Sequence, residues 1–192
     1  MNAMTFLTNN IDFQQAPKNL VEMFIYQKFL ENKINNFRTR DIRDIKKSFL
    51  VELGEFDEET PESHKTWKDK DIEKNKMLEE LADVYSFLSQ MINYLYENNA
   101  NIFQGKDPAE KKNILIQLDY NFKVENHFFT EDKKDIYLDI TEAVSKRIID
   151  INYIFQLLGH FTYLYGFTEE DILNAYYRKW KKNTGRIGTE WR

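Results

Sequence analysis

The chain contains no cysteine among its 192 residues. This absence excludes disulfide bonds, thiolate metal sites and a cysteine nucleophile. Apolar runs are only a few residues long, and residues 1–10 lack the basic and apolar regions of a signal peptide. From the sequence we therefore expect a cytoplasmic protein that neither spans a membrane nor is exported.

Glycine and proline are also scarce, with 6 and 3 residues. Thr60 before Pro61 and Asp107 before Pro108 are typical of a helix start, where proline takes the first helical position. Apolar residues recur at helical spacing, while the alternation typical of strands is rare. We therefore predict an all-α bundle of about six helices, over residues 18–36, 40–58, 72–98, 108–122, 132–165 and 172–182.

The hydrophobic and aromatic content of the chain predicts one folded domain, over residues 1–192. Hydrophobic residues make up 42% and aromatic residues 15%, which is ample apolar surface to offset the entropy of folding. Residues 99–131 fit an accessory insertion. The sequence from Thr168 to Asp171 resembles a capping box that opens the last helix.

Charge is unevenly distributed along the chain. The net charge is −5, which argues against binding to a nucleic acid polymer through phosphate contacts. Residues 178–192 hold six basic residues against Glu190, a charge of +5, so the other residues carry −10. The basic segment either complements the dipole of a helix end or, as a mobile lid, meets a polyanionic ligand on the acidic body.

Two pairs of acidic residues interrupt apolar helix faces. Glu52 shares a face with Phe49 and Phe56, and Glu55 follows it at i+3. The next predicted helix repeats the pattern, because Glu80 interrupts a stripe of apolar residues and Asp83 follows at i+3.

Four acids that converge between two helices repel one another unless a cation neutralises them. Ligation by oxygen alone suits Mg²⁺ better than Zn²⁺. The alternative is that these acids are ordinary solvated side chains. Gly54, between the first two acids, indicates either the close approach of a helix or ligand, or a tolerated defect.

Four blocks of sequence match the motifs of one family in order and spacing. They are Glu52-Leu-Gly-Glu55, Ser63-His-Lys-Thr-Trp67-Lys68, Glu79-Glu80-Leu-Ala-Asp83, and the segment from Ala175 to Arg186. These blocks resemble the dimeric all-α dUTPases, which belong to the all-α nucleoside triphosphate pyrophosphatases. The resemblance implies a homodimer that hydrolyses dUTP, and also dUDP, to dUMP.

The resemblance also implies roles for individual residues. Glu52, Glu55, Glu80 and Asp83 would hold Mg²⁺, and Glu55 would accept the proton of the attacking water. The predicted substrate-binding residues are Gln27, Trp67 and Phe87 for the uracil base and Lys68, Lys179, Asn183 and Arg186 for the phosphates or the covering lid.

Three positions depart from the family pattern. Glu31 stands where an asparagine is usual beside the base, Trp180 stands where many members carry asparagine, and Ile187 stands where glutamine is common. Glu31 keeps a second hypothesis open, a related pyrophosphatase for dCTP or another nucleoside triphosphate. A third hypothesis is a helical dimer without catalytic activity that binds a regulatory protein.

Overall fold

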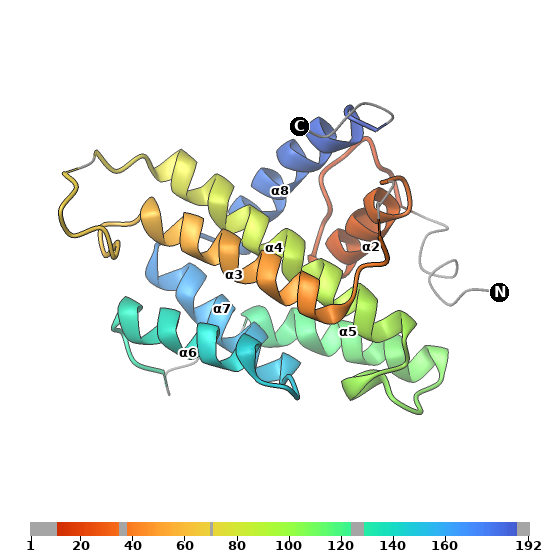
Figure 1. Ribbon diagram of the computed structural model, residues 1–192. Helices are drawn as coiled ribbons and strands as arrows, with labels where there is room; N and C mark the ends of the chain where they lie inside the picture. The colour runs from red at the N-terminus through yellow and green to blue at the C-terminus, as the bar shows by residue number, and fades with distance from the viewer. Residues whose placement is uncertain (1–10, 35–37, 70, 124–128, 188–192) are drawn as a thin grey trace.

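The computed structural model describes residues 11–34, 38–69, 71–123 and 129–187. These residues contain seven α-helices, one short 3-10 helix (Asn101–Phe103) and no strand, which confirms the predicted all-α fold (Figure 1). No helix in the described ranges is both long enough and apolar enough to cross a bilayer. The helices are α2 (Leu20–Glu31), α3 (Ile42–Glu58), α4 (Lys74–Glu97), α5 (Pro108–Lys123), α6 (Lys133–Ser145), α7 (Ile151–Leu164) and α8 (Glu169–Thr184).

Helices α3 and α4 lie side by side through the middle of the bundle, with α2 and α8 on one side and α5, α6 and α7 on the other (Figure 1). Their apolar faces meet in the core. Phe49, Leu53 and Phe56 of α3 are fully buried, as are Leu81 and Tyr85 of α4. The two predicted acidic pairs therefore belong to the two central helices.

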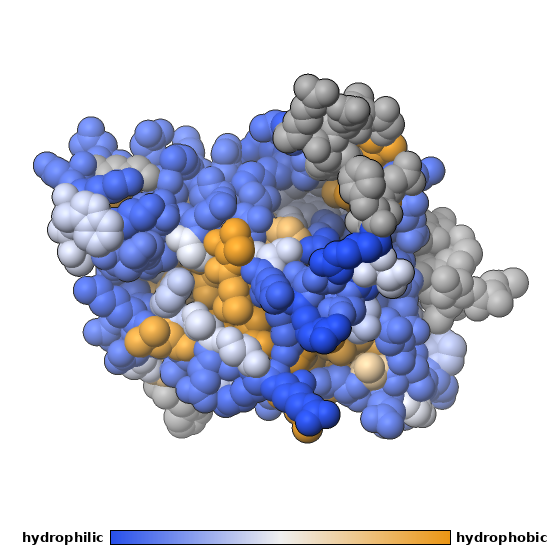
Figure 2. Space-filling model, in the orientation of Figure 1, coloured by the Kyte–Doolittle hydropathy of each residue, from blue (hydrophilic) through white to orange (hydrophobic). Residues whose placement is uncertain are grey.

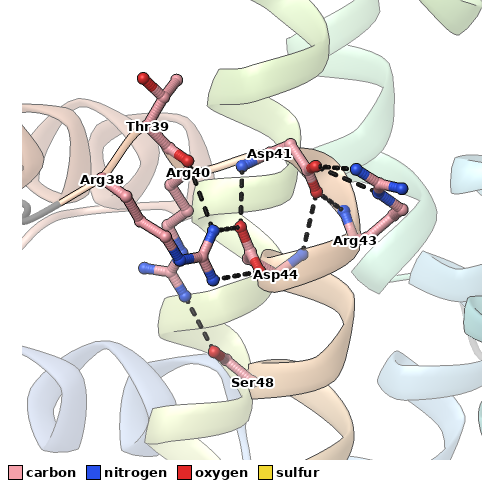
Figure 3. Close-up of polar contacts among 7 residues, drawn as sticks. All are labelled: Arg38, Thr39, Arg40, Asp41, Arg43, Asp44 and Ser48. Atoms are coloured by element: carbon pink, nitrogen blue, oxygen red, sulfur yellow. Dashed lines mark hydrogen bonds and ion pairs between the residues drawn. The ribbon is translucent and has the colours of Figure 1, made fainter.

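The first turn of α3 is fixed by a network of charged and capping contacts (Figure 3). The Asp41 side chain accepts hydrogen bonds from the backbone N–H groups of Arg43 and Asp44, and Asp44 accepts one from the Asp41 N–H in return. The Arg38 guanidinium donates two hydrogen bonds of 2.6 Å to the Asp44 carboxylate. This capping box explains why α3 begins within two residues of the predicted start.

The predicted single helix over residues 132–165 is wrong, because the chain forms two helices there. Lys146 has ψ 144°, which is not helical, and ends α6. Asp150 then accepts a hydrogen bond from the Tyr153 N–H at 3.1 Å and caps α7. Apolar residues continue across this break, and Ile149 is buried, so the apolar pattern alone concealed it.

Of the two prolines predicted to begin a helix, one does so and the other does not. Pro108 is the first residue of α5, as expected. Pro61 begins no helix, because it lies in the irregular segment that joins α3 to α4. There the Thr60 hydroxyl donates a hydrogen bond to the Asp57 carbonyl. The Thr60 side chain is therefore bonded to the end of α3 and does not cap a new helix.

Helix α5 lies within the range predicted as an accessory insertion, and it packs into the common core. Leu115, Leu118 and Phe122 are buried there. Helix α7 crosses it closely at Gly159, where a Cβ atom would stand 2.7 Å from the Phe122 carbonyl oxygen. The glycine therefore permits a contact between the two helices that no other residue allows without a shift.

Helix α8 begins with the predicted capping box, since Thr168 and Asp171 each bond the backbone N–H of the other. Its last turns contain Trp180, which is only 6% exposed and donates its Nε1–H to the Tyr26 carbonyl at 2.9 Å. The first part of the predicted lid, residues 178–184, is thus a packed helix. The last part, residues 188–192, lies outside the described residues.

Candidate active site

Three of the four predicted acids come together between the central helices. Glu52 of α3 and Glu80 and Asp83 of α4 each offer a carboxylate oxygen, and these oxygens lie within 4.8 Å of one another. All three side chains are half-buried. Glu55, one turn further along α3, is exposed and does not belong to this group. The arrangement follows from the i, i+3 spacing on two helices that pack side by side.

The proximity of these acids changes their ionisation. The pKa of Glu52 is raised to about 7, mainly by burial and then by the charges of Asp83 and Glu55, against the opposing effect of Lys179. Burial also raises the pKa of Glu80 and of Asp83. Negative charge is therefore crowded at this site, and a cation that entered it would be strongly attracted.

A lysine from a third helix already supplies part of that positive charge. Lys179 of α8 forms an ion pair and a hydrogen bond with Asp83, and its Nζ lies 3.7 Å from Glu80 Oε2. The sequence placed Lys179 among the substrate-binding residues, and the structure brings it to the acids. Asn183 is half-buried one turn further along α8, and Arg186 is exposed just beyond the helix end.

Gly54 has open space around it. Beyond its own helix, no atom lies within 4 Å of the position that a Cβ would take. A close approach of another helix, one of the readings of this glycine, is therefore wrong for the described residues. The remaining readings are a ligand that needs the space or a glycine that the helix tolerates.

The predicted base-binding residues lie at different places. Gln27 is buried on α2, where its Oε1 accepts a hydrogen bond of 3.1 Å from the Tyr176 hydroxyl. Phe87 is half-buried on α4, one turn after Asp83. Trp67 is 73% exposed, and Lys68 is also exposed, in the segment that projects from the bundle between α3 and α4 (Figure 1). Trp67 and Phe87 thus lie on different elements, the segment between α3 and α4 and helix α4 itself.

Arg40 is a residue of this region that the sequence did not single out. Its guanidinium carbon stands 5.2 Å from the centre of the Phe87 ring. It also donates a hydrogen bond of 2.9 Å to the Ser48 hydroxyl, one turn before Glu52 (Figure 3). Burial lowers the pKa of Arg40, although the group stays charged at neutral pH. Arg40 thus places a cation between Phe87 of α4 and Ser48, on the part of α3 that precedes Glu52.

The site thus combines carboxylates on two neighbouring helices of an all-α bundle with a lysine from a third, an arrangement suited to binding a cation. A family model described as dUTPase matches residues 19–191, nearly the whole chain. The chain therefore belongs to the dUTPase family, which confirms the resemblance read from the sequence motifs and supports hydrolysis of dUTP. No curated protein matches the chain significantly.

Proposed function

We propose that this chain hydrolyses dUTP, and also dUDP, to dUMP in a reaction that requires Mg²⁺. The observation that carries the proposal is the group of half-buried carboxylates on α3 and α4 in a member of the dUTPase family. The chemistry of this group of carboxylates fits Mg²⁺, because every ligand offered is a carboxylate oxygen and the chain has no cysteine. The raised pKa values also indicate negative charge that a divalent cation would relieve.

The proposed ligands are Glu52, Glu80 and Asp83, with Glu55 completing the set from the next turn of α3. When bound, Mg²⁺ would shield the charge of the substrate phosphates and make a water molecule more acidic. Glu55 is exposed at the edge of the site, so its carboxylate can accept the proton that the attacking water loses. Glu52, as the most crowded acid, would hold the position of that water.

The basic residues of α8 would then bind the phosphates. Lys179 already lies at the acids, and its ammonium can turn from Asp83 to a phosphate oxygen as the substrate enters. Asn183 and Arg186 follow along the same end of the chain, so we propose that they cover the substrate, as the predicted lid requires. The positive charge of Lys179 and Arg186 would offset the charge that develops on the leaving pyrophosphate.

The proposal predicts a defined result for a panel of nucleotides. With Mg²⁺, we expect dUTP to give dUMP and pyrophosphate with a kcat/KM at least ~10-fold above that for dCTP or dTTP, since a polar base pocket discriminates by hydrogen bonds. Removal of the metal with EDTA should reduce the rate at least ~100-fold, and added Mg²⁺ should restore it. An assay of pyrophosphate release tests the preferred nucleotide, the products and the need for the metal together. Equal rates on all nucleotides, or activity that survives EDTA, would contradict the proposal.

We also propose that the chain forms a homodimer. The aromatic residues of the long helices, such as Phe49, Phe56 and Tyr85, are buried in the chain's own core and offer no partner surface. Exposed apolar residues remain, among them Val51 of α3 and Leu138 of α6, at 56% and 61% exposure. Figure 2 shows apolar surface across the middle of this face, over α3 and toward α6.

The dimer is tested by a charge placed on this face. We expect light scattering to give twice the chain mass of 23.2 kDa for the wild type, and the single-chain mass for Leu138→Glu, because a buried unpaired charge is costly. Ile116→Glu is the matched control, since Ile116 is also half-exposed but lies on α5. A wild type that runs as a monomer, or a Leu138→Glu variant that stays dimeric, would refute this interface.

A further inference from the structure

One face of α3 is left uncovered by the other helices that the structure describes. The helix packs closely against α4 and more loosely against α6. On its outer side, Lys47, Val51 and Glu55 are exposed, and their spacing of four residues places them along one stripe of the helix. Val51, an apolar residue in the middle of this stripe, is 56% exposed. The stripe is therefore available to a partner.

The charge of this stripe changes sign at its centre. Lys47 and Glu55 lie one turn before and one turn after Val51, each about 6 Å from it along the helix axis. A helix with this pattern is complementary to a second copy of itself that runs in the opposite direction. When Val51 faces Val51, Lys47 of each copy lies beside Glu55 of the other. Two parallel copies would instead place lysine beside lysine and glutamate beside glutamate, which repel each other.

The charges at the two ends of the stripe do not oppose an antiparallel pairing. The same symmetry brings Asp44 of one copy near Glu58 of the other, and both residues are acids. Each is already paired within its own chain, because Arg38 donates two hydrogen bonds of 2.6 Å to Asp44, and the Lys65 ammonium forms an ion pair with Glu58. Repulsion between these two acids is therefore largely offset.

Small residues on either edge of the stripe allow a second helix to come close. Beyond its own helix, Gly54 has no atom within 4 Å of the position that a Cβ would take. Ser48, on the opposite edge, is half-buried and has a small side chain. With these residues beside Val51, the axes of two α3 helices can lie about 8–10 Å apart, the usual distance between packed helices. The open space at Gly54 would then be filled by the second copy.

We propose that two copies of the chain pair antiparallel through α3, with the twofold axis at Val51. The inference rests on the proposed homodimer and adds to it the helix, the direction and the register of the contact. Glu55 is also the acid proposed to complete the metal site. Each active site would therefore have Lys47 of the other copy at its edge, and the dimer would add a positive charge to each site.

Crosslinking through introduced cysteines tests the register, because the chain has no cysteine of its own. Under mild oxidation with copper phenanthroline, Val51→Cys should give a disulfide-linked dimer on a non-reducing gel, since a disulfide needs Cα atoms about 4.4–6.8 Å apart. Lys47→Cys alone and Glu55→Cys alone should stay unlinked, because like positions lie about 12 Å apart along the axes. The double variant should link. Ile116→Cys, at an exposed position of α5, is the control and should stay unlinked.

Reversal of one charge tests the ion pairs between the copies. Lys47→Glu would face Glu55 of the other copy twice in each dimer, so its dissociation constant at low salt should rise at least ~10-fold in analytical ultracentrifugation. Adding Glu55→Lys to this variant exchanges the two charges and should restore the dimer. Lys112→Glu, which reverses the charge of an exposed lysine on α5, is the control and should not change the dissociation constant.

The outcomes separate this inference from the proposals on which it rests. If light scattering gives a wild-type dimer but Val51→Cys links no more than Ile116→Cys, the copies do not pair through α3, although the homodimer stands. If Lys47→Cys links to itself, the helices are parallel and the proposed direction is wrong. A wild type that is a monomer refutes the pairing together with the homodimer. A chain that links as expected but does not hydrolyse dUTP refutes the proposed function and leaves the pairing in place.

Discussion

Glu52→Gln should reduce kcat for dUTP by about 1000-fold while the protein stays folded. The substitution replaces a carboxylate of the acid group by an amide of the same shape, which removes one charged ligand and leaves the helix intact. The loss of ~4 kcal/mol of transition-state stabilisation corresponds to this factor, and it lies within the range of metal-assisted catalysis. Steady-state kinetics at saturating Mg²⁺ measures the effect.

The same substitution should affect stability in the opposite direction. In metal-free buffer, Glu52 is half-buried beside Asp83 and Glu80, so removal of its charge relieves repulsion and should raise the free energy of unfolding by up to ~1 kcal/mol. Glu142→Gln, an exposed glutamate of α6 paired with Lys146, serves as the control and should change neither quantity. If the Glu52→Gln variant is inactive and has also lost its thermal unfolding transition, Glu52 has a structural role. If the variant keeps full activity, the proposed site is refuted.

The sequence predicted the central helices well because their signals agree. The ranges 40–58 and 72–98 were expected, and α3 and α4 span Ile42–Glu58 and Lys74–Glu97. Both helices have an apolar stripe of helical period, and α3 also begins at a capping box, whereas α4 has no side-chain cap at its start. The acids were predicted from the same periodicity, since their position in an apolar stripe places them at the junction of two helices.

Other features depend on tertiary contacts that no local pattern records. The break between α6 and α7 is marked only by Asp150, a capping residue within a run of apolar positions. Arg40 precedes Ile42, the first residue of α3, and its place above Phe87 follows from how the chain enters that helix.

Trp180 shows how a resemblance can obscure a local pattern. Compared with the family, it was a departure in a segment expected to cover the substrate. On the helix, however, it follows Tyr176 at i+4 and Tyr177 at i+3, and all three are buried on the face that packs against α2. The face of α8 that carries Trp180 is therefore core, and only the neighbouring Lys179 turns toward the acids.

Trp180→Ala should lower the free energy of unfolding by about 3–5 kcal/mol, the usual cost of truncating a buried large aromatic residue. Its ring lies nearly parallel to those of Phe13 and Tyr177, at 5.8 Å and 6.0 Å between centres. The substitution would empty this cluster and leave the Tyr26 carbonyl without its hydrogen bond from Nε1. Denaturant unfolding followed by circular dichroism measures the loss.

Two further variants separate packing from hydrogen bonding. Trp180→Phe keeps a ring in the cluster but removes the Nε1–H donor, so it should lose only about 1–2 kcal/mol. Lys182→Ala, at an exposed position of the same helix, should lose less than ~0.5 kcal/mol. Because Trp180 anchors the turn that carries Lys179, the alanine variant should also raise KM for dUTP at temperatures where it remains folded. If Trp180→Ala unfolds like Lys182→Ala, this end of α8 is not anchored in the core, and residues 178–184 move as part of the lid.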